Sequence, residues 1–296
     1  LMAYLSWFLW KFSDEEYSFN KSLLWVWAPV GLIILPIFPS NFSTAAIIFA
    51  SVCMLLFIGK YPIKYLAKVL GFGLVMGVMA FFAAKAFPDY APSRLSTWVA
   101  RIDRFGSDDK DIDRYQIENA KIAIAQGEIF GVGPGKSIQK NFLPQSSSDF
   151  IYAIIVEEFG FIGGMLILGV YVLLLLRFLV VSNKAPNLFG KYLVIGLGFS
   201  IIFQAIINMG VAVEIFPTTG QPLPLVSSGG TSIWMTCLSL GIILSVSRKE
   251  DEIKRQMADN AAKQEAFKRL LEEQELADKE ERELEGDNPM NAVLNK

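Results

Sequence analysis

Long apolar blocks alternate with short polar segments along most of this chain of 296 residues. Six blocks come close to, or exceed, the roughly 20 mostly apolar residues that a helix needs to cross a membrane. They cover residues 23–39, 43–58, 66–87, 150–181, 191–213 and 228–246. Because apolar residues follow one another within these blocks, the pattern predicts an all-α polytopic membrane protein, built as a bundle of transmembrane helices.

Residues 1–12 form a seventh apolar block that starts at the first residue. It has neither the charged start nor the small-residue cleavage site of a signal peptide. We interpret it as the second half of a membrane helix and expect the chain to be truncated at its N-terminus. The predicted bundle therefore has about six complete transmembrane helices and a partial first one.

Basic residues occupy every second short connection between the apolar blocks, and the long loop 88–148 does not count in this rule. Lys and Arg occur near 11–22, 59–68 and 177–191, whereas the connections near 39–43 and 214–227 have none. Cytoplasmic loops of membrane proteins carry the excess of Lys and Arg. We therefore expect the basic connections and the C-terminal tail in the cytoplasm, and the long loop 88–148 outside it.

The apolar pattern ends near residue 248, which divides the chain into a transmembrane domain, 1–248, and a charged tail, 249–296. The tail is rich in Glu, Lys, Arg, Ala and Gln, and its apolar residues are sparse. This composition is typical of a solvated helix. The tail is either a cytoplasmic extension of the last membrane helix or a docking helix for a partner.

The amino-acid composition excludes several classes of function and catalytic site. Hydrophobic residues make up 53% of the chain and charged residues 19%, which is below the roughly 25% typical of soluble domains. The net charge of −2 gives no sign of nucleic-acid binding. Because the chain has no histidine, Ser-His-Asp and Cys-His nucleophiles and His-bearing zinc or haem sites are excluded. Proton transfer must then fall to Asp, Glu, Lys, Tyr or water.

The loop 88–148 is too long for a simple linker, and long loops are often functional. Arg94 and Arg101 lie beside Trp98 in its first part. They either clamp a phosphate or diphosphate head group or anchor the loop at the membrane interface. Further along, the apolar spacing of 115–127 predicts a short surface helix that ends at Gly127.

Residues 131–137 read Gly-Val-Gly-Pro-Gly-Lys-Ser, which superficially resembles a nucleotide phosphate loop. The required spacing fails because position 130 is Phe, and no strand precedes the segment. We therefore expect these glycines to permit sharp turns against the membrane.

Asp149 stands directly before the apolar block 150–181. It is either part of a helix N-cap, in which Ser148 or Asp149 accepts backbone N–H bonds, or a general base at the water–lipid boundary. Two turns further on, Glu157 and Glu158 are candidates for function, because charged groups inside a membrane are costly.

Gln204 and Asn208 lie one turn apart on one helix face, and we expect them to bond to a neighbouring helix. Prolines and glycines then break the helical pattern over 216–232. Such backbone is tolerated at membrane depth only inside protein or along a cavity. This segment and Asp149 could therefore face one site on the outer side.

Two segments resemble the signatures of a known family, the SEDS proteins. The first covers 126–164 and includes Gly127, Gly131, Gly133, Gly135, Ser137, Leu143, Pro144, Asp149, Phe150, Glu157, Glu158 and Gly160. The second covers 208–232 and includes Asn208, Gly210, Pro217, Thr219, Gly220, Pro222, Pro224, Ser227, Gly229, Gly230 and Ser232. The resemblance extends over 1–248, and residues 136–144 are most similar to the FtsW branch of the family.

The resemblance implies a peptidoglycan glycosyltransferase that polymerises lipid II into glycan strands on the outer face of the bacterial cytoplasmic membrane during cell division. It also implies a class B penicillin-binding protein and other division proteins as partners, contact with membrane lipid, and a divalent cation, Mg²⁺ or Mn²⁺, whose ligands it does not identify. The essential aspartate of the family corresponds to Asp149, so the resemblance favours catalysis over capping.

The chain departs from the family pattern in two places. Ser147 and Ser148 stand where the family often has His-Thr, so a histidine is not required at the site. The Pro-Ser-Glu-x-x-Lys segment of the family should lie just upstream of Leu1, and residues 39–44 match its Gln-Pro-Asp-x-Gly-Thr segment only loosely.

We assign Asp149 as the general base that takes the proton of the attacking sugar hydroxyl. The diphosphate leaving group needs positive charge from a divalent cation or from arginine, with Arg101 as the first candidate. The predicted substrate-binding residues are Arg94, Arg101, Lys136, Ser137, Gln139, Lys140, Glu157, Ser227, Gly229 and Gly230. Three alternatives stay open: a lipid II flippase, an elongation polymerase of the RodA branch, and a non-catalytic scaffold for division proteins.

Overall fold

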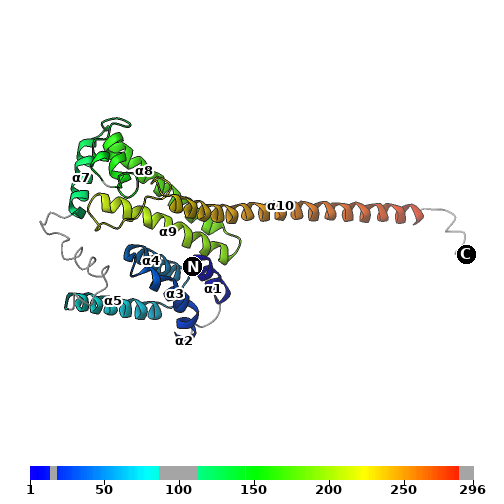
Figure 1. Cartoon of the computed structure of the whole chain (residues 1–296). Coiled ribbons are helices and arrows are strands. Elements are labelled where there is room, and N and C mark those ends of the chain that lie inside the picture. The colour runs from blue at the N-terminus through cyan, green and yellow to red at the C-terminus, as the bar shows by residue number, and fades with distance from the viewer. Residues whose placement is uncertain (14–18, 87–111, 144, 287–296) are drawn as a thin grey trace, which may run out of the picture. The chain divides into compact units, whose positions relative to one another are not determined.

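The computed structural model of the chain describes residues 1–13, 19–86, 112–143 and 145–286 (Figure 1). The helices are α1 (Met2–Lys11), α2 (Phe19–Ser22), α3 (Ala28–Ile37), α4 (Phe42–Ile58), α5 (Ile63–Ala86), α7 (Ile112–Gly127), α8 (Ile151–Lys184), α9 (Leu188–Ala212) and α10 (Gly230–Gly286). A π-helical turn (Leu23–Trp27) joins α2 to α3, and a 3-10 turn covers Gln139–Asn141. All regular structure in the described residues is helical, which confirms the predicted fold class.

Within the described residues, five helical segments are long and apolar enough to cross a membrane by length and composition. They are Phe19–Ile37, Ile63–Ala83, Ile151–Lys184, Leu188–Ala212 and Gly230–Lys249. The apolar helix α4 is shorter, with 17 residues. Each of the six apolar blocks of the sequence thus forms a helix, and the chain is a multi-pass membrane protein.

Two of these helices begin at asparagine caps. Thr44 N donates to Asn41 Oδ1 (3.1 Å) at the start of α4, and Gly190 N donates to Asn187 Oδ1 (2.7 Å) at the start of α9. A cap side chain satisfies a backbone N–H that has no partner within the helix. These polar residues therefore mark where each apolar helix begins.

Helix α9 lies at the centre of the bundle, between α8 and the N-terminal helices α1 and α4 (Figure 1). Small residues on α9 let its neighbours come close, as is typical of membrane bundles. A Cβ at Gly196 would lie 3.2 Å from Leu55 Cδ2 of α4, and one at Gly198 would lie 2.6 Å from Phe178 Cδ2 of α8. Helices α8 and α9 run antiparallel, because the connection between them is only three residues long.

Helix α8 is broken at Gly160, where φ is 72° and ψ is −170°. This backbone conformation is accessible essentially only to glycine. A Cβ atom at this position would also overlap the carbonyl group of Ile129. The segment after α7 pairs with the backbone groups around the break: Val132 N with Glu157 O (3.0 Å), Gly133 N with Glu158 O (3.0 Å) and Phe161 N with Glu128 O (2.8 Å). The loop thereby replaces hydrogen bonds that a continuous helix would make.

The surface helix predicted before this segment is confirmed as α7, which ends at Gly127. Its buried residues Ala120 and Ala123 pack with Phe150 and Ala153 at the start of α8. The expected glycine turns also form, since Gly131, Gly133 and Gly135 all have positive φ. This arrangement fixes the chain on both sides of the break in α8.

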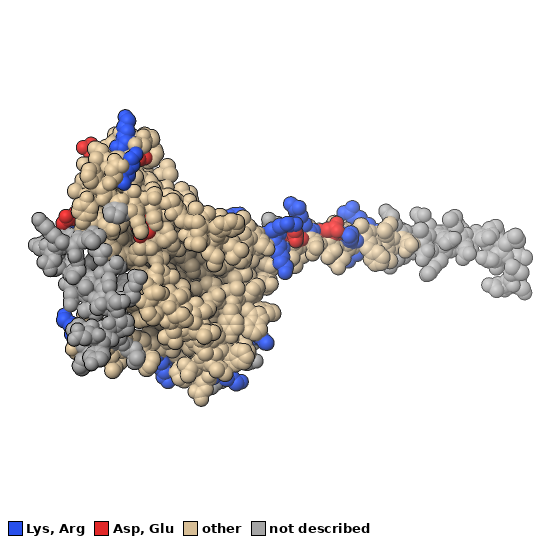
Figure 2. All heavy atoms as spheres, viewed as in Figure 1, with Lys and Arg blue, Asp and Glu red and all other residues tan. Residues whose placement is uncertain are grey.

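The chain divides into two compact units, Leu1–Ser247 and Arg248–Lys296. In the first unit, Lys, Arg, Asp and Glu lie mostly at the edges of the face seen in Figure 2, whose middle is uncharged. The second unit is helical to Gly286, and its described side chains up to residue 274 are exposed except that of Ile253. Pairs one turn apart, Arg248 with Glu252 (2.9 Å) and Asp259 with Lys263 (2.8 Å), support this helix.

Candidate active site

The turn before α8 presents the carboxylate of Asp149 without using it as a cap. The helix begins at Ile151, its N-cap residue is Phe150, and no side chain makes a cap hydrogen bond there. The capping interpretation of Asp149 and Ser148 is therefore wrong. Instead, Asp149 N donates to Gln145 O (3.1 Å), and Ser148 Oγ donates to Asp149 Oδ1 (2.7 Å).

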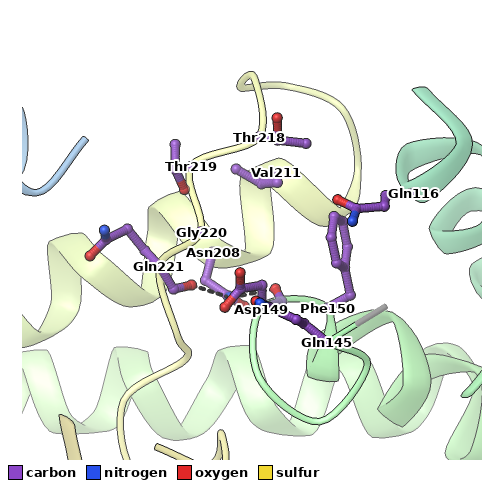
Figure 3. A pocket seen from close by; sticks show the side chains of 10 residues that line it. All are labelled: Gln116, Gln145, Asp149, Phe150, Asn208, Val211, Thr218, Thr219, Gly220 and Gln221. Carbon is purple, nitrogen blue, oxygen red and sulfur yellow. Dashed lines mark hydrogen bonds between the residues drawn. The ribbon is translucent and has the colours of Figure 1, made fainter. Parts of the chain in front are cut away.

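Asp149 lines a cavity of about 400 Å³, which we call the aspartate cavity. Figure 3 shows its lining, which comes from α7, the turn before α8, the end of α9 and the segment that follows α9. The described lining residues are Gln116, Gln145, Asp149, Phe150, Asn208, Val211, Thr218, Thr219, Gly220 and Gln221. Asp149 is the one acid among them, and the other polar groups are neutral amides and hydroxyls.

Asn208 joins the two predicted halves of the site. Its Nδ2 donates to Asp149 O (2.8 Å) and to Gln221 O (2.7 Å), and its side chain is 1% exposed. Asn208 Oδ1 is buried without a hydrogen-bond partner. The side chain therefore holds two irregular backbone segments together and leaves one acceptor oxygen unpaired beside the cavity.

The neighbouring amide, Gln204, also bonds to irregular backbone. Its Nε2 donates to Pro222 O (3.0 Å). The expectation that Gln204 and Asn208 bond to a neighbouring helix is therefore wrong, because both amides donate to carbonyl groups of irregular backbone. We call residues 218–222 the strap, since this irregular segment is bonded to the last turns of α9.

Further bonds tie the segment after the strap to the turn that holds Asp149. Ser227 Oγ donates to Ser148 O (2.5 Å), and Ser228 N donates to Ser147 O (2.9 Å). A Cβ at Gly220 of the strap would lie 3.5 Å from Asp149 Oδ2. The prediction that the two segments face one site is confirmed by these contacts.

Three predicted substrate-binding residues form a separate buried cluster. Glu157 is 0% exposed, and its carboxylate accepts bonds from Ser137 Oγ, Ile138 N (2.9 Å) and Gln139 N (3.3 Å). Ser137 and Gln139 are also buried. We call Glu157 and 137–139 the glutamate cluster; none of its residues lines the aspartate cavity.

The remaining predicted residues lie outside the glutamate cluster, and none of those that the structure describes lines the aspartate cavity. Lys136 and Lys140 are exposed, and Lys140 Nζ donates to Gly135 O (2.9 Å). Gly229 and Gly230 lie where α10 begins, outside the lining of the aspartate cavity. Ser227 is buried in the contact with Ser148. Arg94 and Arg101 lie outside the described residues.

Most of the neutral residues that line the aspartate cavity could not be predicted from the sequence. Gln116, Gln145 and Thr218 come from three segments far apart in the chain. Isolated polar residues in loops and surface helices are common, so nothing in their spacing distinguished them. The pairing of Asn208 with the broken segment after it was the one usable signal.

Comparisons with known proteins agree with this architecture. A family model described as cell cycle protein, named for FtsW, RodA and SpoVE, matches residues 1–252. A probable peptidoglycan glycosyltransferase FtsW of Xanthomonas oryzae is 33% identical over 260 residues, which are 86% of this chain and 51% of that protein. Stage V sporulation protein E of Bacillus subtilis is 42% identical over 135 residues, 45% of this chain and 37% of that protein.

Among solved structures, a chain of a peptidoglycan synthase complex has the same fold, with a TM-score of 0.60 and 24% identity. The match covers 83% of this chain and 68% of that one. The chain spans between half and two thirds of the length of the FtsW relatives from Xanthomonas oryzae, Nitrosococcus halophilus and Coxiella burnetii. With the match over 1–252 and the two motifs meeting at one cavity, the chain belongs to the FtsW, RodA and SpoVE family of cell cycle proteins, the SEDS family.

Proposed function

We propose that this protein is a peptidoglycan glycosyltransferase that polymerises lipid II during cell division, with Asp149 as its general base. The observation that carries the proposal is the position of the Asp149 carboxylate, the one acid among the described residues that line a polar cavity at one end of the bundle. The relatives named as probable peptidoglycan glycosyltransferases support the substrate class.

The proposed reaction is a displacement at the anomeric carbon of a diphosphate-linked sugar. The 4-hydroxyl oxygen of the acceptor bonds to that carbon, the bond to the diphosphate oxygen breaks, and the hydroxyl proton passes to Asp149. A hydroxyl is a poor nucleophile until a base takes its proton, and a positioned base contributes about 10²–10⁴ in rate. One serine hydroxyl bonds to the Asp149 side chain, which leaves carboxylate lone pairs for the substrate.

We further propose that a divalent cation neutralises negative charge on the diphosphate leaving group. Among the described residues there is no group of three or more His, Cys, Asp or Glu that could hold a metal ion. Mg²⁺, however, is commonly bound by one or two carboxylates together with substrate phosphates. Asp149 and the unpaired oxygen of Asn208 fit that limited role, and a cation there would supply positive charge to the diphosphate.

The cavity is proposed to open on the outer side of the membrane. The start of α8, the end of α9 and the strap meet at the cavity, whereas Lys60, Lys184 and Lys191 lie at the opposite ends of α4, α8 and α9. Basic residues favour the cytoplasmic side, so the C-terminal tail is proposed to be cytoplasmic. The solved complex that shares the fold is described as one that coordinates polymerisation and crosslinking, which supports a class B penicillin-binding protein as partner.

The test compares Asp149→Asn with Glu214→Gln in purified protein, with its penicillin-binding partner, labelled lipid II and divalent cation. Glu214 is a suitable control because it lies at the same end of α9, does not line the cavity and pairs with Lys121. We expect Asp149→Asn to lower glycan synthesis at least about 100-fold and Glu214→Gln to stay within about threefold of the unmodified protein.

Normal glycan synthesis by Asp149→Asn would overturn the assignment of the base. Transfer of lipid II across vesicles without glycan chains would support a flippase instead. Glu157, one of the two acids on which the flippase hypothesis rests, is buried and does not line the aspartate cavity.

A further inference from the structure

A second cavity, of about 410 Å³, lies between α4, α9 and α10. We call it the hydroxyl cavity because six Ser and Thr residues line it: Thr44, Ser200, Thr231, Ser232, Thr236 and Ser239. None of the described residues that line it is charged. Its volume is within the range of about 300–1,000 Å³ that small-molecule sites occupy.

Helix α10 turns a polar face toward this cavity and an apolar face away from it. Ser232, Thr236 and Ser239 follow one another at spacings of four and three residues, so they share one face, and Thr236 is 6% exposed. On other faces, Trp234 is 78% and Leu238 is 61% exposed, as expected of side chains in contact with lipid. Polar groups inside a membrane bundle are retained where they meet a polar partner or ligand.

Three of the six hydroxyls that line the hydroxyl cavity can act only as hydrogen-bond acceptors toward a ligand. The hydroxyl protons of Thr236, Ser239 and Ser200 are donated to carbonyl groups of their own helices, Ser232 O (2.8 Å), Met235 O (2.9 Å) and Gly196 O (2.8 Å). The oxygen of each hydroxyl remains able to accept a bond. A wall of neutral acceptors recognises a ligand rich in hydroxyl or amide donors, and it offers no countercharge to a phosphate.

The strap separates the hydroxyl cavity from the aspartate cavity. Gly220 and Gln221 line both. Gln221 O accepts from Asn208 on the side of the aspartate cavity (2.7 Å), while Gln221 Nε2 donates to Thr44 Oγ1 on α4 (2.9 Å). A ligand made of linked sugars that reaches Asp149 with one sugar can therefore place the next sugar on the other side of the strap, in the hydroxyl cavity.

We infer that the hydroxyl cavity is a second carbohydrate subsite, which holds a neutral, N-acetylated sugar unit next to the reacting one. This inference rests on the proposed function, because it assumes that the substrate of that reaction carries linked sugars. It assigns the sugar, and not the diphosphate, to the face formed by Ser232, Thr236 and Ser239. Removing an acceptor then weakens substrate binding without touching the base.

The test uses the double variant Ser232→Ala/Thr236→Val, which removes two hydroxyls and nearly keeps side-chain shape. Ser51→Ala is the matched control: Ser51 is buried in α4, donates to its own helix (2.9 Å) and does not line the hydroxyl cavity. A neutral hydrogen bond changes an equilibrium by about 2- to 12-fold. We expect the double variant to raise the KM for lipid II about tenfold with kcat within about threefold, and Ser51→Ala to change neither.

A binding assay separates this inference from the proposed function. Binding of a short-chain lipid II analogue is measured in an Asp149→Asn background, with and without the double substitution, and competed by an N-acetylated disaccharide or by inorganic diphosphate. Weaker binding and competition by the disaccharide support the subsite. The subsite is overturned if a folded double variant keeps its KM and its binding, or if only diphosphate competes. Either result leaves the proposed glycosyltransferase activity intact.

If the double variant unfolds more readily than Ser51→Ala, the milder Ser239→Ala replaces it, with the same criteria. Absence of glycan synthesis in the unmodified protein would overturn the proposed function. The binding assay would then still decide whether the hydroxyl cavity takes a sugar.

Discussion

Two carboxylates near the start of α8, those of Asp149 and Glu157, have opposite surroundings. Asp149 faces a cavity and receives one side-chain hydrogen bond. Glu157 is completely buried and receives three bonds from a single loop. A carboxylate whose acceptor sites are filled by its own protein organises structure, whereas one with free lone pairs beside a cavity can take a proton.

The difference also separates two kinds of irregular backbone. Near Glu157, the loop 128–139 pairs with the broken helix and with the buried carboxylate, so its polar groups are used within the fold. Near Asp149, the strap is held by Asn208 and Gln204, and its residues Gly220 and Gln221 line a cavity on each side. One region stabilises the bundle, and the other presents groups to a ligand.

The largest effect on stability is expected from Gly160→Ala in the structural region. The new Cβ would overlap the carbonyl of Ile129, at a backbone conformation that costs another residue about 1–3 kcal/mol. We expect the free energy of unfolding in detergent micelles to fall by more than about 3 kcal/mol. Gly169→Ala is the control, because Gly169 lies in the same helix with nothing near its Cβ position. Equal stability of the two variants would contradict this role of Gly160.

A smaller loss is expected from Glu157→Gln. The glutamine side chain places an NH₂ group where a carboxylate oxygen now accepts hydrogen bonds. We therefore expect the free energy of unfolding to fall by about 1–3 kcal/mol. Glu158→Gln, at a half-buried neighbouring position, should stay within about 0.5 kcal/mol. Asp149→Asn should also retain its stability while it loses activity. A stable Glu157→Gln with abolished glycan synthesis would reverse the roles that we give the two carboxylates.

The smallest effect is expected at the ion pair between Lys121 and Glu214. This pair joins α7, which contributes Gln116 to the aspartate cavity, to the end of α9. The two side chains are 51% and 42% exposed, and exposed pairs contribute about 0.2–1 kcal/mol. A double-mutant cycle with Lys121→Ala and Glu214→Ala should give a coupling energy in that range. A coupling above about 2 kcal/mol would show that α7 is held by charge more than by Ala120 and Ala123.

Much of the fold could be read from the residues alone. Apolar blocks predicted the helices, because a helix in lipid satisfies its own backbone and only needs apolar side chains. Gly127 marked the end of α7, and the helix-breaking residues after Asn208 marked the strap. The positions of Asp149 and of this broken segment on the same side followed from the alternation of basic loops.

The partners of polar groups could not be read in the same way. Gln204 and Asn208 bind carbonyl groups of irregular backbone, which every residue type carries and no sequence pattern distinguishes. Glu157, predicted to bind substrate, lies outside the lining of the aspartate cavity because a loop 18 to 20 residues away folds onto it.

The sequence by itself therefore determined the membrane bundle, its motifs and the candidate aspartate, since these depend on local hydrophobicity and residue type. Only the tertiary structure decided which carboxylate is enclosed and which faces a cavity. That decision depends on long-range backbone hydrogen bonds: those at Gly160 close the fold around Glu157, and those of Asn208 hold the strap beside Asp149.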